Sequence, residues 1–147
     1  MATTSTPIFA QAPYAAIANL SAVTACTTRG PTATANLAAA NIIVLVPTTT
    51  NGVRIDQITI KASSTAFTSA TVAQTVTLWY WDGTTAFPID EFLVTAVTPS
   101  TTVASFKLVT AMSNLSVNAS HALYVSTSIT TTASTTALTV IAIGGSY

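Results

Sequence analysis

The feature that most constrains the fold is the regular recurrence of short segments rich in Thr, Val and Ile, each followed by turn residues. β-Branched side chains fit a pleated sheet well and lose conformational freedom in a helix. Turns recur about every ten to twelve positions, which is typical of antiparallel sandwiches and barrels. The sequence therefore predicts an all-β fold, an antiparallel β-sandwich resembling a jelly roll with about eight strands, at residues 14–20, 41–46, 53–63, 71–83, 86–97, 101–110, 121–129 and 135–147.

Two dipeptides predict tight turns. Asn51-Gly52 and Asp82-Gly83 tolerate positive φ and favour hairpins, so we expect the strands on either side of each dipeptide to pair. The apolar run just before the first dipeptide, "IIVLV" at 42–46, predicts a strand that is buried on both faces.

The alternation of apolar residues changes phase within the segment 53–63. Val53 and Ile55 share one parity, whereas Ile58 and Ile60 have the other. One extra residue near positions 56 and 57 would return all four side chains to the same face. The segment therefore predicts a strand that contains a β-bulge.

The segment 71–83 contains both tryptophans of the chain. Trp79 and Trp81 have the opposite parity to Val76, Leu78 and Tyr80, so both faces of this strand are apolar. Burying an indole removes about 150–250 Å² from water. We expect one face to meet the core and the other to be covered by a neighbouring subunit or by a loop. The alternative is a sugar-stacking platform, with the carboxylates of Asp82 and Asp90 as hydrogen-bonding groups.

Charge is unusually scarce in this chain. Only 5% of the residues are charged and the net charge is zero, whereas about 25% is usual in globular proteins. No basic stripe is available to bind the phosphates of a nucleic acid. Despite a mean hydropathy of +0.60, the longest purely apolar run is far shorter than the roughly 20 residues of a membrane-spanning helix. An uncharged surface promotes self-association, so we expect other subunits to cover much of it.

Groups that perform chemistry are few and scattered. Asp90 and Glu91 are adjacent on a predicted strand and therefore point to opposite faces, which prevents them from acting as a facing acid–base pair. His121 is the only histidine and Cys26 the only cysteine, too few for a zinc site. The sequence therefore predicts no catalytic residue, no metal site and no cofactor, and a protein that is not an enzyme.

The chain begins with a segment that differs from the rest. Residues 1–12 are rich in Thr and Ser and predict an extended arm, whereas residues 13–147 predict a single β-sandwich domain. The arm lacks the charged and apolar regions of a secretory signal, so we expect synthesis in the cytoplasm. The residues that we expect at a subunit or capsid interface come from the arm, the tryptophan strand and the C-terminus: Thr3, Thr4, Pro7, Ile8, Phe9, Trp79, Trp81 and Tyr147.

Four features of the chain occur together: "RIDQITIKA" at 54–62, an aromatic strand that ends in Asp82-Gly83-Thr84, "VTAVTPS" at 94–100 preceded by Glu91, and the terminal "GGSY" at 144–147. In this combination the chain resembles a family of small virion proteins of tailed bacteriophages. The resemblance covers roughly the last two-thirds of the chain. The resemblance implies a structural component of the virion, a decoration or cement protein of the capsid. The Thr- and Ala-rich stretches and the paired tryptophans depart from the family pattern.

These expectations combine into one hypothesis with two rivals. The first hypothesis is a bacteriophage capsid decoration protein that forms a homo-oligomer, expected to be a trimer, and bridges the major capsid protein on the exterior of the virion. It binds neither nucleic acid nor membrane. The rivals are a receptor- or glycan-binding module of a tail fibre or spike, and a pilin or surface-layer subunit.

Overall fold

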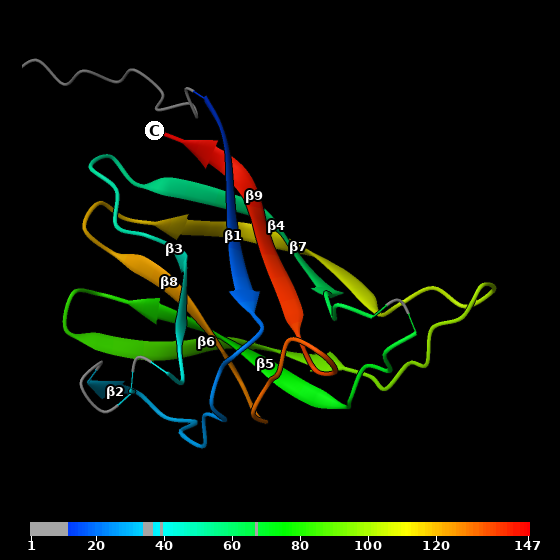
Figure 1. Cartoon of the computed structure of the whole chain (residues 1–147). Helices are drawn as coiled ribbons and strands as arrows, with labels where there is room; N and C mark the ends of the chain where they lie inside the picture. The colour runs from blue at the N-terminus through cyan, green and yellow to red at the C-terminus, as the bar shows by residue number, and fades with distance from the viewer. Residues whose placement is uncertain (1–11, 34–36, 39, 67) are drawn as a thin grey trace, which may run out of the picture.

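The computed structural model describes residues 12–33, 37, 38, 40–66 and 68–147, and it is an all-β sandwich of two antiparallel sheets (Figure 1). The predicted all-β class and the antiparallel sandwich are therefore confirmed. The four-stranded sheet has the order β1 (Ala12–Leu20), β9 (Leu138–Ser146), β4 (Val53–Ala62) and β7 (Lys107–Val117). The five-stranded sheet has the order β2 (Thr32–Ala33), β6 (Thr85–Val94), β5 (Gln74–Trp81), β8 (Ala122–Thr127) and β3 (Ile43–Val46).

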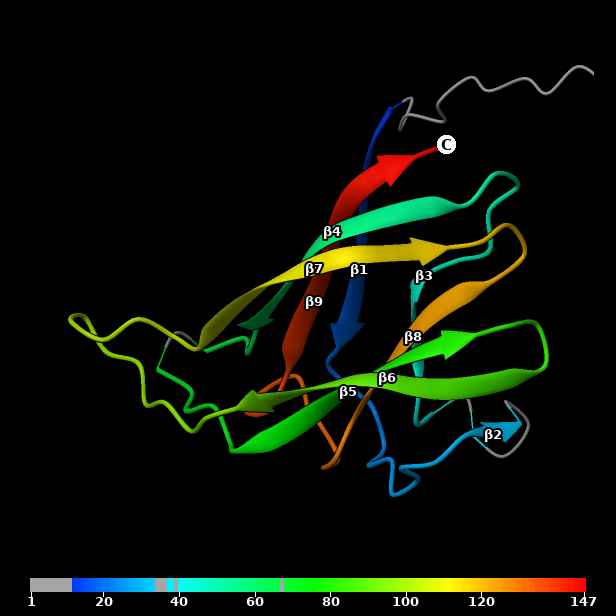
Figure 2. The same cartoon turned by 180° about the vertical axis from the view of Figure 1, so that it is seen from behind.

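The chain crosses repeatedly between the two sheets. β1 and β9 lie side by side although they are the first and last strands of the sequence, and their register runs from Ala12 opposite Ser146 to Leu20 opposite Leu138 (Figure 1, Figure 2). β9 also pairs with β4 on its other side. The four-stranded sheet is thus held together by strands from distant parts of the sequence.

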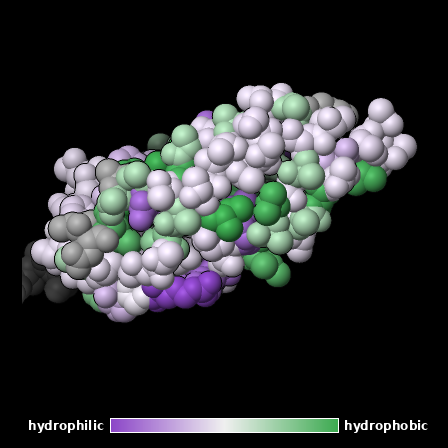
Figure 3. Space-filling view, turned by 60° about the horizontal axis from the view of Figure 1, so that its bottom comes forward, coloured by the Kyte–Doolittle hydropathy of each residue, from purple (hydrophilic) through white to green (hydrophobic). Residues whose placement is uncertain are grey.

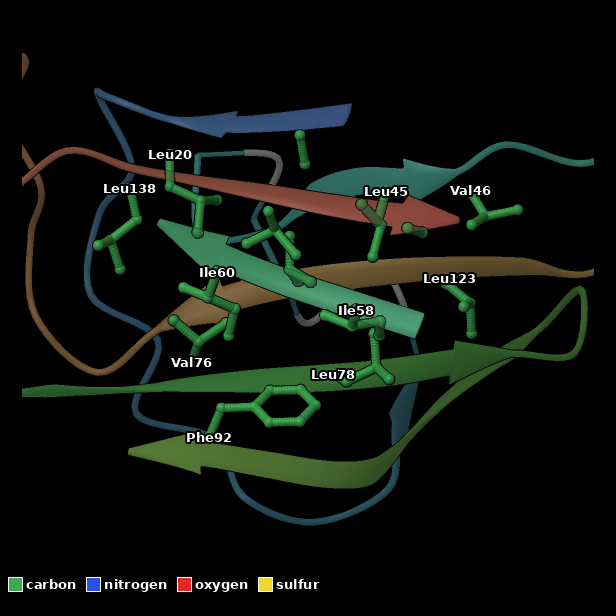
Figure 4. Packing of buried hydrophobic residues seen from close by; sticks show 14 of the residues in the cluster. Leu20, Leu45, Val46, Ile58, Ile60, Val76, Leu78, Phe92, Leu123 and Leu138 are labelled. Carbon is green, nitrogen blue, oxygen red and sulfur yellow. The ribbon is translucent and has the colours of Figure 1, made fainter. Parts of the chain in front are cut away.

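The main core fills the space between the sheets. In Figure 4, Ile58 and Ile60 from β4 point toward Val76 and Leu78 from β5. Leu, Ile and Val side chains from both sheets make up most of this cluster, with Phe92 and Phe106 as its aromatic members. Removal of this apolar surface from water is the main stabilising term of such a sandwich.

The predicted β-bulge in β4 is confirmed. The register of β4 against β9 shifts between Ile55 and Gln57, so Asp56 is an additional residue on the β4 side. As a result Val53, Ile55, Ile58 and Ile60 all lie in the core, and each is almost completely buried.

The backbones of β9 and β4 approach closely next to this bulge. A methyl group on Gly144 would overlap the carbonyl oxygen of Arg54 and crowd the Cα atom of Ile55. Only glycine fits here, because any side chain would push the two strands apart.

The turn at Asn51-Gly52 does not form the hairpin that the sequence predicts. Gly52 has a φ of 84°, as a turn residue should, but β3 and β4 belong to different sheets. The turn therefore links the two layers. A positive-φ dipeptide reverses the chain, and the partners of the flanking strands decide whether the reversal makes a hairpin.

β3 also differs from its prediction. It is the outermost strand beside β8, and Val44 is 44% exposed, so the strand is not buried on both faces. The predicted strand at 101–110 is displaced as well. β7 begins only at Lys107 and continues to Val117. Its second half, residues 111–117, lies between two of the predicted strands. Nine strands are present among the described residues, because the two-residue β2 adds to the predicted eight.

The predicted hairpin at Asp82-Gly83 is confirmed, since β5 and β6 are neighbours and Gly83 has a φ of 105°. Oδ1 of Asp82 accepts hydrogen bonds from the backbone N–H groups of Thr84 and Thr85, at 2.9 and 2.8 Å. This side chain therefore closes the turn.

Candidate functional site

Trp79 is completely buried within the chain itself. It lies on the side of β5 that faces away from the main core, in a second cluster with Cys26, Leu37, Ile42 and Ala86. The indole N–H donates a 2.8 Å hydrogen bond to Oγ of Ser126. The sequence predicts that a neighbouring subunit or a loop covers this face, and in the structure a loop covers it. Trp79 therefore does not lie on the surface, where we expected an interface residue.

The covering loop, made of residues 21–33, 37, 38 and 40–42, is attached to the five-stranded sheet at several points. The backbone N–H of Cys26 donates to the carbonyl of Thr127 at 2.8 Å. Further along, β2 pairs with β6, with Thr32 opposite Ala86. The thiol of Cys26, itself a residue of this loop, is buried, and its Sγ lies 3.8 Å from the carbonyl oxygen of Thr28. These contacts make the loop a fixed layer over the tryptophan strand.

Trp81 lies at the rim of the same cluster and is half-buried. Its ring meets that of Tyr124 edge-on, with centroids 6.2 Å apart and an interplanar angle of 85°. Tyr147 is also half-buried, and its backbone N–H donates to the carbonyl of Gly52 at 3.3 Å. The five predicted interface residues of the arm lie outside the described residues: Thr3, Thr4, Pro7, Ile8 and Phe9.

The outer face of the four-stranded sheet has no such cover within the described chain. Its central row runs across all four strands, from Ile17 on β1 through Ile141 and Thr59 to Val109 on β7. These side chains point outward because the residues beside them in each strand, such as Ile58 and Val140, belong to the core. Ile17 is 66% exposed.

A second row next to it is also uncharged. Ala15, Ile143, Gln57 and Ala111 lie opposite one another across the same four strands. The side-chain amide of Gln57 donates to Oγ1 of Thr59 at 3.1 Å, which satisfies part of the polar surface between the rows. We call these two rows, which together contain eight residues, the open face.

The charged residues of this sheet lie beyond the two ends of the open face. Arg54 and Asp56 form an ion pair at one end, with 2.7 Å between Nε and Oδ1. The carboxylate holds the pKa of Arg54 above its usual value, through this hydrogen bond and by its charge. Lys61 and Lys107 lie opposite each other at the other end. An exposed apolar area with a charged rim is the usual composition of a protein–protein interface.

The opposite side of the molecule is charge-poor as well. Figure 3 brings forward the side on which β2 and β5 lie in Figure 1, and shows a mostly pale surface with hydrophobic groups near its centre. Strongly hydrophilic colour gathers mainly at one edge of this view. Leu93, on the outer side of β6, is 66% exposed.

Asp90, Glu91 and His121 are engaged in structural contacts. Glu91 pairs with Arg29 at 3.2 Å, and Oδ1 of Asp90 accepts from the N–H of Glu91 at 2.8 Å. Nδ1 of His121 lies 2.7 Å from the hydroxyl of Tyr80. Within the part of the chain that the structure describes, His, Cys, Asp and Glu residues form no group of three or more that could hold a metal ion. None of the described segments is a helix capable of crossing a membrane.

Sequence reasoning missed Ile17, Val109, Ile141 and Ile143, which carry the open face. The available signal was the alternation of side chains along the strand: in the run "LTVIAI" at 138–143, apolar residues occupy both faces of the strand, as they do in the tryptophan strand.

Comparison with protein-family models, with curated proteins and with solved structures finds no match for the chain.

Proposed function

We propose that the chain is a structural subunit of a bacteriophage virion, a decoration protein that binds copies of itself and the major capsid protein on the outside of the shell. The open face is the observation that carries this proposal. It presents two uncharged rows across four strands and ends in charged residues. A subunit that remains assembled for the lifetime of a particle buries such a surface permanently.

The open face supplies part of a contact between copies. Four strands about 4.8 Å apart and two rows, each occupying about 6.6 Å along the strands, give a face of about 250 Å² on each copy. Two such faces bury about 500 Å², which is about half of what a specific interface needs. A stable assembly therefore needs a second contact, and the predicted arm and the capsid surface are the partners that we propose for it. A homotrimer remains the oligomer that we expect.

The strand order supports a virion role. Without the short β2, the sheets read β1-β9-β4-β7 and β6-β5-β8-β3, with most connections passing from one sheet to the other. We interpret this order as that of a jelly roll, an architecture found in viral capsid and lectin domains. Because one fold serves many functions, the open face and the resemblance to phage virion proteins carry more weight than the topology.

The glycan-binding alternative has less support. A sugar-stacking platform needs an accessible aromatic face, and Trp79 is completely buried in its cluster under the covering loop. Of the two indoles only Trp81 has exposed surface, and it already meets Tyr124 edge-on.

Quantitative mass spectrometry of purified virions tests the proposal. We expect the chain in a copy number comparable to that of the major capsid protein, and we expect particles without it to release DNA on mild heating. A copy number of a few per particle would indicate a tail protein and contradict a shell function. Intact heads of unchanged heat resistance in its absence would contradict a reinforcing function.

A further inference from the structure

Lys61 and Lys107 form an unusual pair at one end of the four-stranded sheet. They are directly opposite each other on β4 and β7, both are exposed, and their side chains share the outer face. Each of the other two cations has a carboxylate partner, Glu91 for Arg29 and Asp56 for Arg54. No described carboxylate pairs with either lysine. Two like charges directly opposite on neighbouring strands destabilise a sheet, so the folded chain keeps an unfavourable pair.

Protection of a sheet edge explains only one of these lysines. A lysine on an edge strand discourages pairing with another chain, and β7 is an edge strand. β4, however, lies between β9 and β7. Lys61 therefore protects no edge, and its position beside Lys107 requires another reason.

A hollow of about 550 Å³ adjoins the pair, and Lys61 is one of its lining residues. Its walls are the segments that follow β4 and precede β7, and the second of these extends beyond the end of the sheets (Figure 1, Figure 2). Six of its lining residues carry hydroxyl groups. Three of these hydroxyls, those of Ser64, Thr101 and Ser105, have no hydrogen-bond partner among the described residues and remain available as donors.

Hydrogen bonds hold both walls in place. Ser69 Oγ donates to the carbonyl of Ser134 at 2.8 Å, which fixes the first wall. In the second wall, the N–H of Ser100 donates to the carbonyl of Val103 at 2.9 Å. The N–H of Ala62 donates to the carbonyl of Phe106 at 3.0 Å and joins the bases of the two walls. The backbone segments that carry the donors are thus held in place before any ligand arrives, which lowers the entropic cost of binding.

We propose that this hollow is an oxyanion-binding site in which Lys61 and Lys107 neutralise a phosphate or carboxylate group and the free hydroxyls donate hydrogen bonds to it. Charge-assisted hydrogen bonds are about twice as strong as neutral ones. The bound anion also removes the repulsion between the lysines. The phosphate or carboxylate group belongs either to a free inorganic anion or to an acidic side chain of a neighbouring protein. This proposal does not depend on the proposed virion function.

Isothermal titration at low ionic strength tests the proposal with two probes, inorganic phosphate and the peptide acetyl-Gly-Asp-Glu-Gly-amide. We expect saturable binding of at least one probe to the full chain. Lys61→Gln should weaken this binding about tenfold or more, because it removes the lysine that lines the hollow. Binding of phosphate alone would identify a free anion as the ligand, and binding of the peptide alone would identify a protein carboxylate.

Arg29→Gln is the matched control, since it removes one cation that is already paired elsewhere and should leave binding unchanged. A second measurement compares denaturation midpoints. Phosphate should stabilise the natural chain more than chloride does at equal ionic strength, whereas Lys61→Gln should be more stable without anion and should lose the phosphate effect. Absence of saturable binding for both probes, or an equal loss in Arg29→Gln, would overturn the proposal.

Discussion

Described residues between positions 21 and 42 cover Trp79 on the outer side of the five-stranded sheet, whereas the outer face of the four-stranded sheet leaves Ile17 and Val109 exposed. Both faces are apolar in sequence, because β5 and β9 each have apolar residues of both parities. The difference lies in the connections. The long segment between β1 and β3 is available to fold over Trp79, and no described segment has the same position over Ile141. We infer that an uncovered face of this kind is reserved for a second molecule.

The largest expected effect is on the covered face. Trp79→Ala removes the largest fully buried side chain and leaves the N–H partner Ser126 and the covering loop without support, so we expect a loss of about 3–5 kcal/mol in the free energy of unfolding. Equilibrium urea denaturation measures this loss. Trp81→Ala, at the half-buried rim, should cost clearly less. Equal losses for the two variants would mean that the loop does not seal the cluster.

The next effect concerns the junction that builds the open face. Gly144→Ala places a methyl group against the carbonyl of Arg54, and relief of this overlap requires β9 to move away from β4. We expect a loss of about 1–3 kcal/mol, the usual range for overpacking. Gly30→Ala is the control, because a Cβ there meets nothing within 4 Å. An unchanged urea midpoint in Gly144→Ala would show that the backbones of β9 and β4 leave room for a methyl group at this position.

The open face itself should affect association more than folding. Ile17→Thr removes the most exposed apolar side chain of the open face, and we expect self-association measured by sedimentation to weaken about tenfold, with a change in unfolding free energy of only about 0.5 kcal/mol. Leu93→Thr is the matched control, since Leu93 is equally exposed, at 66%, but lies on the other sheet. If Leu93→Thr has the larger effect on association, the contact lies on the five-stranded sheet instead.

The smallest effect is a pH dependence at the β5–β6 turn. Hydrogen bonds from the backbone N–H groups of Thr85 and Thr84 lower the pKa of Asp82 below its usual value. Its contribution to stability is therefore complete above the unfolded-state pKa of about 3.9 and is lost as the pH falls through the lower folded-state pKa. Asp82→Asn should flatten the fall in urea midpoint as the pH drops below about 4. An identical fall in both proteins would assign the effect to other carboxylates.

The predictable parts of the fold are those that local alternation determines. The bulge in β4 can be placed from the alternation of Val53, Ile55, Ile58 and Ile60 alone. Without an extra residue in the strand, two of these side chains would point out of the core. The turn at Asp82-Gly83 was equally readable, because its residues close the reversal by themselves. In both cases the physical cause lies within a few residues of the observed feature.

The parts that could not be predicted depend on distant pairing. Alternation gives the face of a side chain but not the neighbour of a strand, so the Asn51-Gly52 turn was assigned to a hairpin although β3 pairs with β8. The open face has the same origin. Its central row joins β1 to β9, β4 and β7, and a single strand's pattern contains no information about that assembly.

The position of β9 between β1 and β4 has a consequence for biosynthesis. Among the described strands, β1 is translated first, yet its partner in the sheet, β9, is translated last. The four-stranded layer is therefore completed late, after nascent β1 has waited unpaired through the translation of more than a hundred residues. The open face is complete only at that moment, so under the proposed virion function we expect unfinished chains to lack this contact surface.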